Sequence, residues 1–167
     1  MVTLASMSRA QHPEHVNVYK DFPAAYQALS ALEQACANGP LDHALFELVK
    51  LRASQINGCA FCIDMHHKDA RAAGETEERL YMLPAWREAT VYSEAERAAL
   101  ALTEAVTLIA AGPVPADVEA EARSRFDAPS YAALVFTIAT INTWNRIAIT
   151  THSPAGRYRP NLTASPA

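Results

Sequence analysis

Glycine is scarce in this chain, and its positions constrain the fold more than any other feature of the sequence. Five glycines occur in 167 residues, too few for a sandwich or a barrel with many tight turns. Gly39, Gly58, Gly74 and Gly112 each stand where an apolar, alanine-rich stretch stops, as helix-ending glycines do. No convincing alternation of apolar and polar residues marks a strand between them. The sequence therefore predicts an all-α fold.

Capping residues and prolines set the expected helix limits. Pro40 follows the first stop, Ser93 and Glu96 have the spacing of a capping box, and Asp127 and Pro129 introduce a long apolar helix. The expected helices cover residues 21–37, 41–56, 59–73, about 76–84, 93–108, 116–126, and from about 128 to 151. They form one helical domain of residues 21–153, between an N-terminal arm of residues 1–20 and an irregular C-terminal tail of residues 154–167.

Composition narrows the possible function classes. A net charge of −4 leaves no basic stripe to neutralise phosphates, which argues against nucleic-acid binding. Half of the residues are hydrophobic, which leaves room for a buried interface between copies of the chain. The first residues lack the apolar core of a signal peptide, and three cysteines are a poor disulfide framework. We therefore expect a cytoplasmic protein whose cysteines are mostly reduced.

Residues 131–150 approach the length of a membrane span. Asn142, Asn145 and Arg146 interrupt this apolar run, and an arginine at mid-span costs about 2.5–3.5 kcal/mol on insertion scales. We interpret the segment as a buried core or interface helix and expect no membrane partner.

The stretch INGCAFCIDMHH, residues 56–67, holds two of the three cysteines and two of the six histidines. On a helix that begins at Cys59, the side chains of Cys59, Cys62 and His66 lie at about 0°, 300° and 340°, on one stripe. Cysteines at this spacing are close enough for a disulfide. The first thiol lies on the opening turn, where free N–H groups favour a thiolate, and His66 can take or supply a proton. The spacing therefore predicts a dithiol with an acid–base partner.

Glu47 is a candidate partner for this histidine. The helix expected at residues 41–56 is apolar on nearly every face, so it should be largely buried. A carboxylate in its middle needs a raised pKa or a polar partner. The tight turn at Asn57 and Gly58 should pack this helix against the cysteine helix as a hairpin. Glu47 would then face His66, orient its imidazole and tune the thiolate.

Other interpretations of these residues stay open at this point. The two cysteines could be buried structural thiols or zinc ligands, although no second CxxC or histidine cluster completes a tetrahedral site. Glu47 could form a salt bridge or an oligomer contact. We interpret His67 as a hydrogen-bonded polar histidine and Cys36 as a small apolar filler. Residues 144–146 could line the site, but we expect a core or interface position for them.

A four-residue pattern of fixed spacing, E-x11-C-x2-C-x3-H, is formed by Glu47, Cys59, Cys62 and His66. It resembles the pattern of the alkylhydroperoxidase AhpD-like branch of the carboxymuconolactone decarboxylase family. The surrounding helical pattern extends the resemblance over roughly residues 41–111. The segment INTWNRIAI, residues 141–149, is similar to one found in many peroxidase-related members.

The resemblance implies an all-helical fold that assembles as trimers or hexamers, and thiol peroxidase chemistry. It implies that Cys62 attacks the peroxide, that Cys59 resolves, and that Glu47 and His66 relay protons. The cycle would run from a thiolate through a sulfenic acid to a disulfide, which an external dithiol of a thioredoxin or lipoyl type would reduce. No haem, flavin or metal cofactor is implied. Decarboxylase members of the family lack the CxxC pair, which argues against lactone chemistry here.

Phe61 departs from the pattern, because some active peroxidase members carry a histidine just before the second cysteine. An apolar side chain there would favour an organic hydroperoxide over hydrogen peroxide. Two further functions stay open: a dithiol–disulfide oxidoreductase or redox adaptor that passes electrons to a partner protein, and a non-catalytic oligomeric scaffold whose dithiol senses oxidation. The two thiols should differ in pKa. The helix dipole favours the lower pKa at Cys59, whereas the neighbouring His66 and the resemblance favour it at Cys62, and we expect Cys62 to have the lower value.

Overall fold

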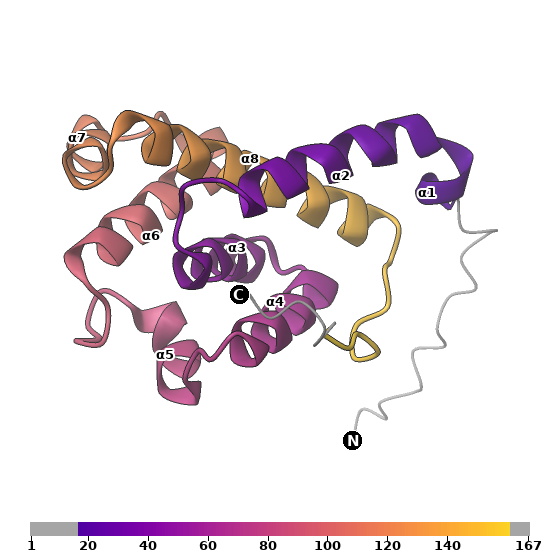
Figure 1. Cartoon of the computed structure of the whole chain (residues 1–167), viewed down its shortest axis with the longest axis horizontal. Coiled ribbons are helices and arrows are strands. Elements are labelled where there is room, and N and C mark those ends of the chain that lie inside the picture. The colour runs from indigo at the N-terminus through magenta and orange to yellow at the C-terminus, as the bar shows by residue number, and fades with distance from the viewer. Residues whose placement is uncertain (1–16, 161–167) are drawn as a thin grey trace, which may run out of the picture.

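The computed structural model describes residues 17–160, and all regular secondary structure in this range is helical (Figure 1). The elements are α1 (Val18–Asp21), α2 (Pro23–Ala37), α3 (His43–Asn57), α4 (Ala60–Ala72), α5 (Glu77–Met82), η1 (Leu83–Ala85), α6 (Glu94–Thr107), η2 (Ile109–Ala111), α7 (Ala116–Arg125) and α8 (Ala128–Thr150). The expected all-α class is confirmed, and the expected helix limits agree closely with these. Helix α1 begins inside the expected N-terminal arm, whose first sixteen residues lie outside the described range.

Local signals explain where several of these helices begin and end. The predicted capping box is present: the Ser93 side chain accepts from the Glu96 backbone N–H, and the Glu96 carboxylate accepts from the Ser93 N–H. Asp42 caps α3, and its carboxylate accepts from two backbone N–H groups. Gly58 ends α3 at φ 68, a left-handed conformation that glycine adopts without strain. The chain can therefore turn sharply from α3 into α4.

Helix α3 lies at the centre of the fold. It packs against α4, α6 and α8, and Figure 1 shows it between α4 and the pair formed by α2 and α8. Leu45 and Val49 join an apolar cluster with residues of α6, α7 and α8, whereas Leu48 and Leu51 join another with residues of α4, α5 and α6. Because apolar neighbours cover several sides of α3, three polar residues of this helix are buried as well: Glu47, Lys50 and Ser54.

Helix α8 confirms the interpretation of residues 131–150 as a core helix. Leu134, Ile138 and Ile141 are fully buried. Leu134 and Ile138 share a cluster with residues of α3, α6 and α7, whereas Ile141 shares one with residues of α3 and α4. Within residues 17–160, no helix is long and apolar enough to cross a membrane. On its other side, α8 exposes Phe136 and Ile149 to solvent.

The chain continues after α8 as an irregular segment. The C-terminal segment, residues 151–160, descends from the end of α8 to α4, and it is yellow in Figure 1. Side chains of α4 hold it there, as the backbone N–H of Gly156 donates to Asp64 at 3.0 Å.

Candidate active site

The two cysteines lie where α3 turns into α4. Cys59 is the N-cap residue of α4, and its Sγ accepts from the backbone N–H of Cys62 at 3.4 Å. The two Sγ atoms are 2.6 Å apart, and each residue is 1% exposed. The expected hairpin and the expected juxtaposition of the two thiols are therefore both present, with the sulfurs enclosed by protein.

The two thiols differ in acidity because their hydrogen-bonding roles differ. The hydrogen bond between the two thiols lowers the Cys59 pKa most, and the backbone N–H of Cys62 and the Asn145 side chain lower it further. Against the opposing effect of burial, they bring the Cys59 pKa to about 7. The hydrogen bond to Cys59 and burial both raise the pKa of Cys62. Our expectation that Cys62 has the lower pKa is wrong in this geometry, because the sulfur at the helix N-cap collects the donors.

A pH profile of alkylation measures this difference. We expect iodoacetamide to modify the reduced protein with a midpoint near pH 7, instead of the value of about 8.5 for an ordinary thiol. Cys59→Ser should lose the low midpoint, whereas Cys36→Ser, a control on α2, should keep it. A midpoint near 8.5, or a low midpoint that survives in Cys59→Ser, would show that Cys59 is not the acidic thiol.

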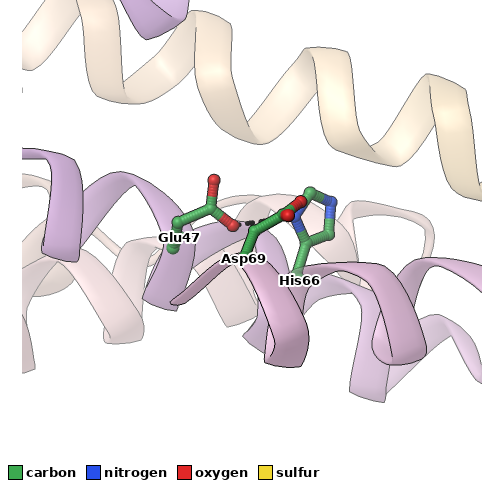
Figure 2. A group of neighbouring side chains, drawn as sticks. All are labelled: Glu47, His66 and Asp69. Atoms are coloured by element: carbon green, nitrogen blue, oxygen red, sulfur yellow. Dashed lines mark hydrogen bonds and ion pairs between the residues drawn. The ribbon is translucent and has the colours of Figure 1, made fainter. Parts of the chain in front are cut away.

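Glu47 and His66 form a buried pair beside the cysteines. The His66 Nδ1 atom lies 2.9 Å from Glu47 Oε2, and the two residues are 1% and 5% exposed (Figure 2). Burial raises the Glu47 pKa, but the hydrogen bond from His66 and the charge of Lys50 offset this effect and hold the pKa below its usual value. Glu47 is therefore a carboxylate at neutral pH, which can only accept, so Nδ1 of His66 carries the proton.

This tautomer leaves the other ring nitrogen available. Burial and the charge of Lys50 lower the His66 pKa, so the imidazole is neutral at neutral pH. Its Nε2 atom is buried and has no hydrogen-bond partner within residues 17–160. Leaving a buried polar atom unpaired costs about 1–3 kcal/mol. An unpaired basic nitrogen one helical turn beyond Cys62 is suited to accept a proton.

Lys50 is a site residue that the sequence analysis did not identify. It lies one turn beyond Glu47 on α3, is 5% exposed, and forms an ion pair with Glu33 of α2. Its positive charge lowers the pKa of Glu47 and of the Cys62 thiol. The argument that predicted a buried Glu47 applies equally to Lys50, because both lie in the middle of the same apolar helix.

Asn145 connects α8 to the cysteines. Its side chain is fully buried, donates to Ser54 Oγ at 3.0 Å and accepts from the Asn57 side chain at 2.8 Å. It also donates to the sulfurs, which lowers the pKa of both thiols. Of residues 144–146, Asn145 therefore belongs to the core and also contributes to the site, whereas Trp144 is partly buried and Arg146 is exposed.

Apolar side chains surround the sulfurs. Cys59 and Cys62 share a cluster with Ile141, and the partly buried Phe61 and Trp144 pack against it. The Trp144 indole also donates to Glu33, the partner of the buried lysine. The dithiol thus lies in surroundings of low polarity, with its donors confined to the α4 N-terminus and Asn145.

The structure also locates His67 and Cys36 and tests the zinc hypothesis. His67 hydrogen-bonds to the carbonyl of Ile63 at 2.9 Å, and Cys36 is a buried residue of α2. A zinc site would need the thiols, but in the described range the metal-ligating groups close enough to share an ion are Glu47, His66 and Asp69, without a cysteine. The charge of Lys50 near this trio disfavours a cation there.

Comparison with known proteins gives consistent results. A family model described as the carboxymuconolactone decarboxylase family matches residues 23–105, which include all four residues of the predicted site. The uncharacterized protein YdfG of Bacillus subtilis is 43% identical over 136 residues, which cover 81% of this chain and 92% of that protein. The alkyl hydroperoxide reductase AhpD of Bradyrhizobium diazoefficiens is 38% identical over 76 residues, 46% of this chain and 36% of that protein.

A solved structure shares the whole fold. A protein of unknown function from Agrobacterium tumefaciens, thought to act in antioxidant defence as AhpD, superposes with a TM-score of 0.82 and 41% sequence identity. The superposition covers 86% of this chain and 99% of that one.

Proposed function

The chain belongs to the carboxymuconolactone decarboxylase family, as an AhpD-like member, and from that premise we propose that it is a thiol peroxidase. The observation that carries this proposal is the buried arrangement of two adjacent thiols beside a Glu47–His66 pair whose free nitrogen can take a proton. The substrate is a hydroperoxide, and the electrons come from an external dithiol.

We assign the attack on the peroxide to Cys62. It lies one helical turn before His66, whose Nε2 has the lone pair needed to remove the thiol proton. The Cys62 sulfur then attacks the terminal oxygen of the hydroperoxide: a sulfur–oxygen bond forms, the oxygen–oxygen bond breaks, and the alkoxide takes the proton held by His66 and leaves as an alcohol. Cys62 is thereby oxidised to a sulfenic acid, and the peroxide is reduced by two electrons.

The low pKa of Cys59 suits it to the second step. A resolving thiol attacks as the thiolate, and Cys59, with a pKa of about 7, is largely in that form near neutral pH. Its sulfur lies 2.6 Å from Cys62 and attacks the sulfenic sulfur to form the disulfide. The hydroxide that leaves combines with the proton that Cys59 had released on ionisation and departs as water. Reduction by an external dithiol restores both thiols and yields the oxidised form of that dithiol.

Peroxide consumption with a simple dithiol tests the proposal. We expect the protein to consume cumene hydroperoxide with dithiothreitol as the electron donor, and one disulfide of dithiothreitol to form for each peroxide reduced. A protein that consumes no peroxide under these conditions, although its thiols remain free and alkylatable, would contradict the peroxidase assignment. That outcome would leave two alternatives: the redox adaptor, and the scaffold with a redox-sensing dithiol.

Phe61 predicts a preference for organic hydroperoxides. Its ring packs against the cluster that contains both cysteines, so it provides an apolar surface beside the sulfurs. We expect cumene hydroperoxide to react several-fold faster than hydrogen peroxide, and Phe61→His to reduce this ratio to about one. Phe46→Leu on α3 is a control that should keep the ratio. Equal rates of the two peroxides with the parent protein would contradict this assignment.

A dithiol–disulfide oxidoreductase, or redox adaptor, is the second candidate. The Cys59 pKa of about 7 favours it, because a thiol whose pKa lies near the ambient pH exchanges with disulfides fastest. This function uses the same four residues and differs only in substrate. Reduction of a model disulfide at a rate exceeding that of peroxide would favour it.

We further propose that the protein is a homo-oligomer, a trimer or hexamer, in the cytoplasm, where thiols are kept reduced. Helices α2 and α8 pack together and expose large apolar side chains, which a second copy would cover: Phe22, Tyr26, Leu32, Phe136 and Ile149. Light scattering of the purified chain measures this assembly, and a monomer at micromolar concentration would contradict it.

A further inference from the structure

The C-terminal segment contacts the helix that carries the cysteines and His66. Three hydrogen bonds hold it against α4: Gly156 N–H to Asp64 at 3.0 Å, Lys68 Nζ to the Tyr158 carbonyl at 3.1 Å, and the Tyr158 hydroxyl to Asp69 Oδ1 at 2.8 Å. The last of these brings a tyrosine from 89 residues further along the chain to a carboxylate of α4. The segment therefore ends in a contact with a charged group of the site helix.

That carboxylate lies beside the Glu47–His66 pair. One ligand atom each of Glu47, His66 and Asp69 lie within 4.8 Å of one another, and Figure 2 shows the two carboxylates and the imidazole gathered between α3 and α4. Within residues 17–160 no hydrogen bond joins Asp69 to His66, so the influence of Asp69 on the ring is that of a nearby charge. Tyr158 is its hydrogen-bond partner.

We propose that Asp69, held by Tyr158, is a positioning residue that stabilises the imidazolium formed when His66 takes the thiol proton. The proposal rests on the thiol chemistry argued above and adds a second carboxylate, beside that of Glu47, to the relay. It couples the C-terminal segment to the reactivity of the cysteines.

The charges around His66 explain why a second carboxylate matters. Lys50 on α3 and burial both oppose protonation of the ring, while Glu47 on α3 and Glu33 on α2 favour it. The balance leaves the His66 pKa below its usual value, so the imidazolium is costly. A further negative charge within about 5 Å, in partly buried surroundings, makes that cation more attainable.

Tyr158 keeps this charge in place. Burial raises the Asp69 pKa, and so does the neighbouring Glu47, whereas the hydrogen bond from Tyr158 lowers it. Burial and the bond to Asp69 also raise the pKa of Tyr158, so the phenol stays protonated and remains a donor. Loss of this hydroxyl would therefore move Asp69 towards its neutral form and weaken its effect on His66.

The direction of the shift in thiol pKa distinguishes an effect of Asp69 through His66 from a direct effect of its charge on the thiolate. If Asp69 acts through His66, removal of its charge destabilises the imidazolium and shifts thiol ionisation to higher pH. If its charge acted only on the thiolate, removal would favour the thiolate and shift ionisation to lower pH. The two accounts predict opposite directions for the same variant.

The test is the pH profile of iodoacetamide alkylation, followed by mass spectrometry at Cys59 and Cys62 in the reduced full-length protein. We expect Asp69→Asn to shift the Cys62 profile to higher pH and to slow alkylation of Cys62, the thiol whose proton His66 takes, about fivefold at pH 7, and Tyr158→Phe to slow it about twofold. In the double variant, Tyr158→Phe should add nothing to Asp69→Asn, because the charge it supports is gone.

Two variants control for the loss of a hydroxyl and of a charge away from the site. Tyr81→Phe removes the hydroxyl of an exposed tyrosine on α5, and Asp117→Asn removes an exposed charge on α7; neither should shift the profile. Circular dichroism and the melting temperature check that each variant is folded. An unshifted profile in folded Asp69→Asn, a shift to lower pH, or an undiminished Tyr158→Phe effect in the double variant would each overturn the proposal.

This experiment uses no peroxide, so it is independent of the proposed activity. A parent protein that fails to reduce peroxide, yet shows the predicted alkylation shifts, would refute the peroxidase function and leave the Asp69–Tyr158 coupling standing. A protein that reduces peroxide but whose variants show unshifted alkylation profiles would support the peroxidase function and refute the Asp69–Tyr158 coupling.

Discussion

Replacement of Cys62 by serine should abolish peroxide consumption, leaving only the uncatalysed rate. The attacking sulfur is then absent, and a serine hydroxyl cannot replace it because its proton is far less acidic than that of a thiol. Cys59→Ser should also stop turnover, but only after one peroxide has reacted. In that variant the Cys62 sulfenic acid has no neighbouring thiol to resolve it, so a dimedone adduct should form on Cys62 in about one equivalent.

Cys36→Ser is the matched control, because it removes the third cysteine, which is buried on α2. It should retain the parent activity. The opposite pattern would be a dimedone adduct on Cys59 in Cys62→Ser and no reaction with peroxide in Cys59→Ser. It would show that Cys59, the thiol with the lower pKa, attacks the peroxide and that Cys62 resolves. Turnover in both single variants would show that the cysteine pair is not the site.

The second large effect is expected from Glu47→Gln. A neutral amide accepts from His66 Nδ1 but does not stabilise the imidazolium, and it also removes a negative charge beside Lys50. General acid–base catalysis typically contributes 10²- to 10⁴-fold, so we expect the first thiol oxidation to slow by about 10²-fold or more. Stopped-flow measurement of thiol loss after one equivalent of cumene hydroperoxide gives this rate directly.

Glu104→Gln provides the control for the loss of a partly buried carboxylate. Glu104 lies on α6, where it accepts from the Trp86 indole and pairs with Arg52 and Arg87. Its replacement should lower the melting temperature but leave the oxidation rate of the folded protein unchanged. A Glu47→Gln variant that is folded and oxidised as fast as the parent would remove Glu47 from the mechanism and leave it a structural role.

The helices and the dithiol were predictable because their signals are local. The capping box at Ser93, the left-handed Gly58 and the spacing of Cys59, Cys62 and His66 all depend on residues within a few positions of one another. The Glu47–His66 contact was also predictable, although it spans 19 residues, because a short turn joins two consecutive helices and brings their facing sides together.

The parts of the site that could not be predicted depend on distant pairs. Asn145 reaches Ser54 across 91 residues, and Tyr158 reaches Asp69 across 89. The sequence left Asn145 between a site position and a core or interface position, and it gave no signal for Tyr158. Both pairings follow from how α8 and the C-terminal segment pack on α3 and α4. The order of thiol acidity was misjudged for a related reason: it depends on which sulfur receives the hydrogen bonds, and only the folded α4 N-terminus determines that.

The central claim is that Cys59 and Cys62 reduce a peroxide and form a disulfide with each other. Thiol titration of the reduced protein, before and after one equivalent of cumene hydroperoxide, tests it most directly. The account predicts rapid loss of two of the three thiols, with a peptide linking Cys59 to Cys62 recovered by mass spectrometry and both thiols restored by dithiothreitol. The contradicting result is that all three thiols still titrate after exposure to the peroxide, while an oxidised dithiol does convert the protein to the disulfide. That result would exclude the peroxidase and identify a redox adaptor instead.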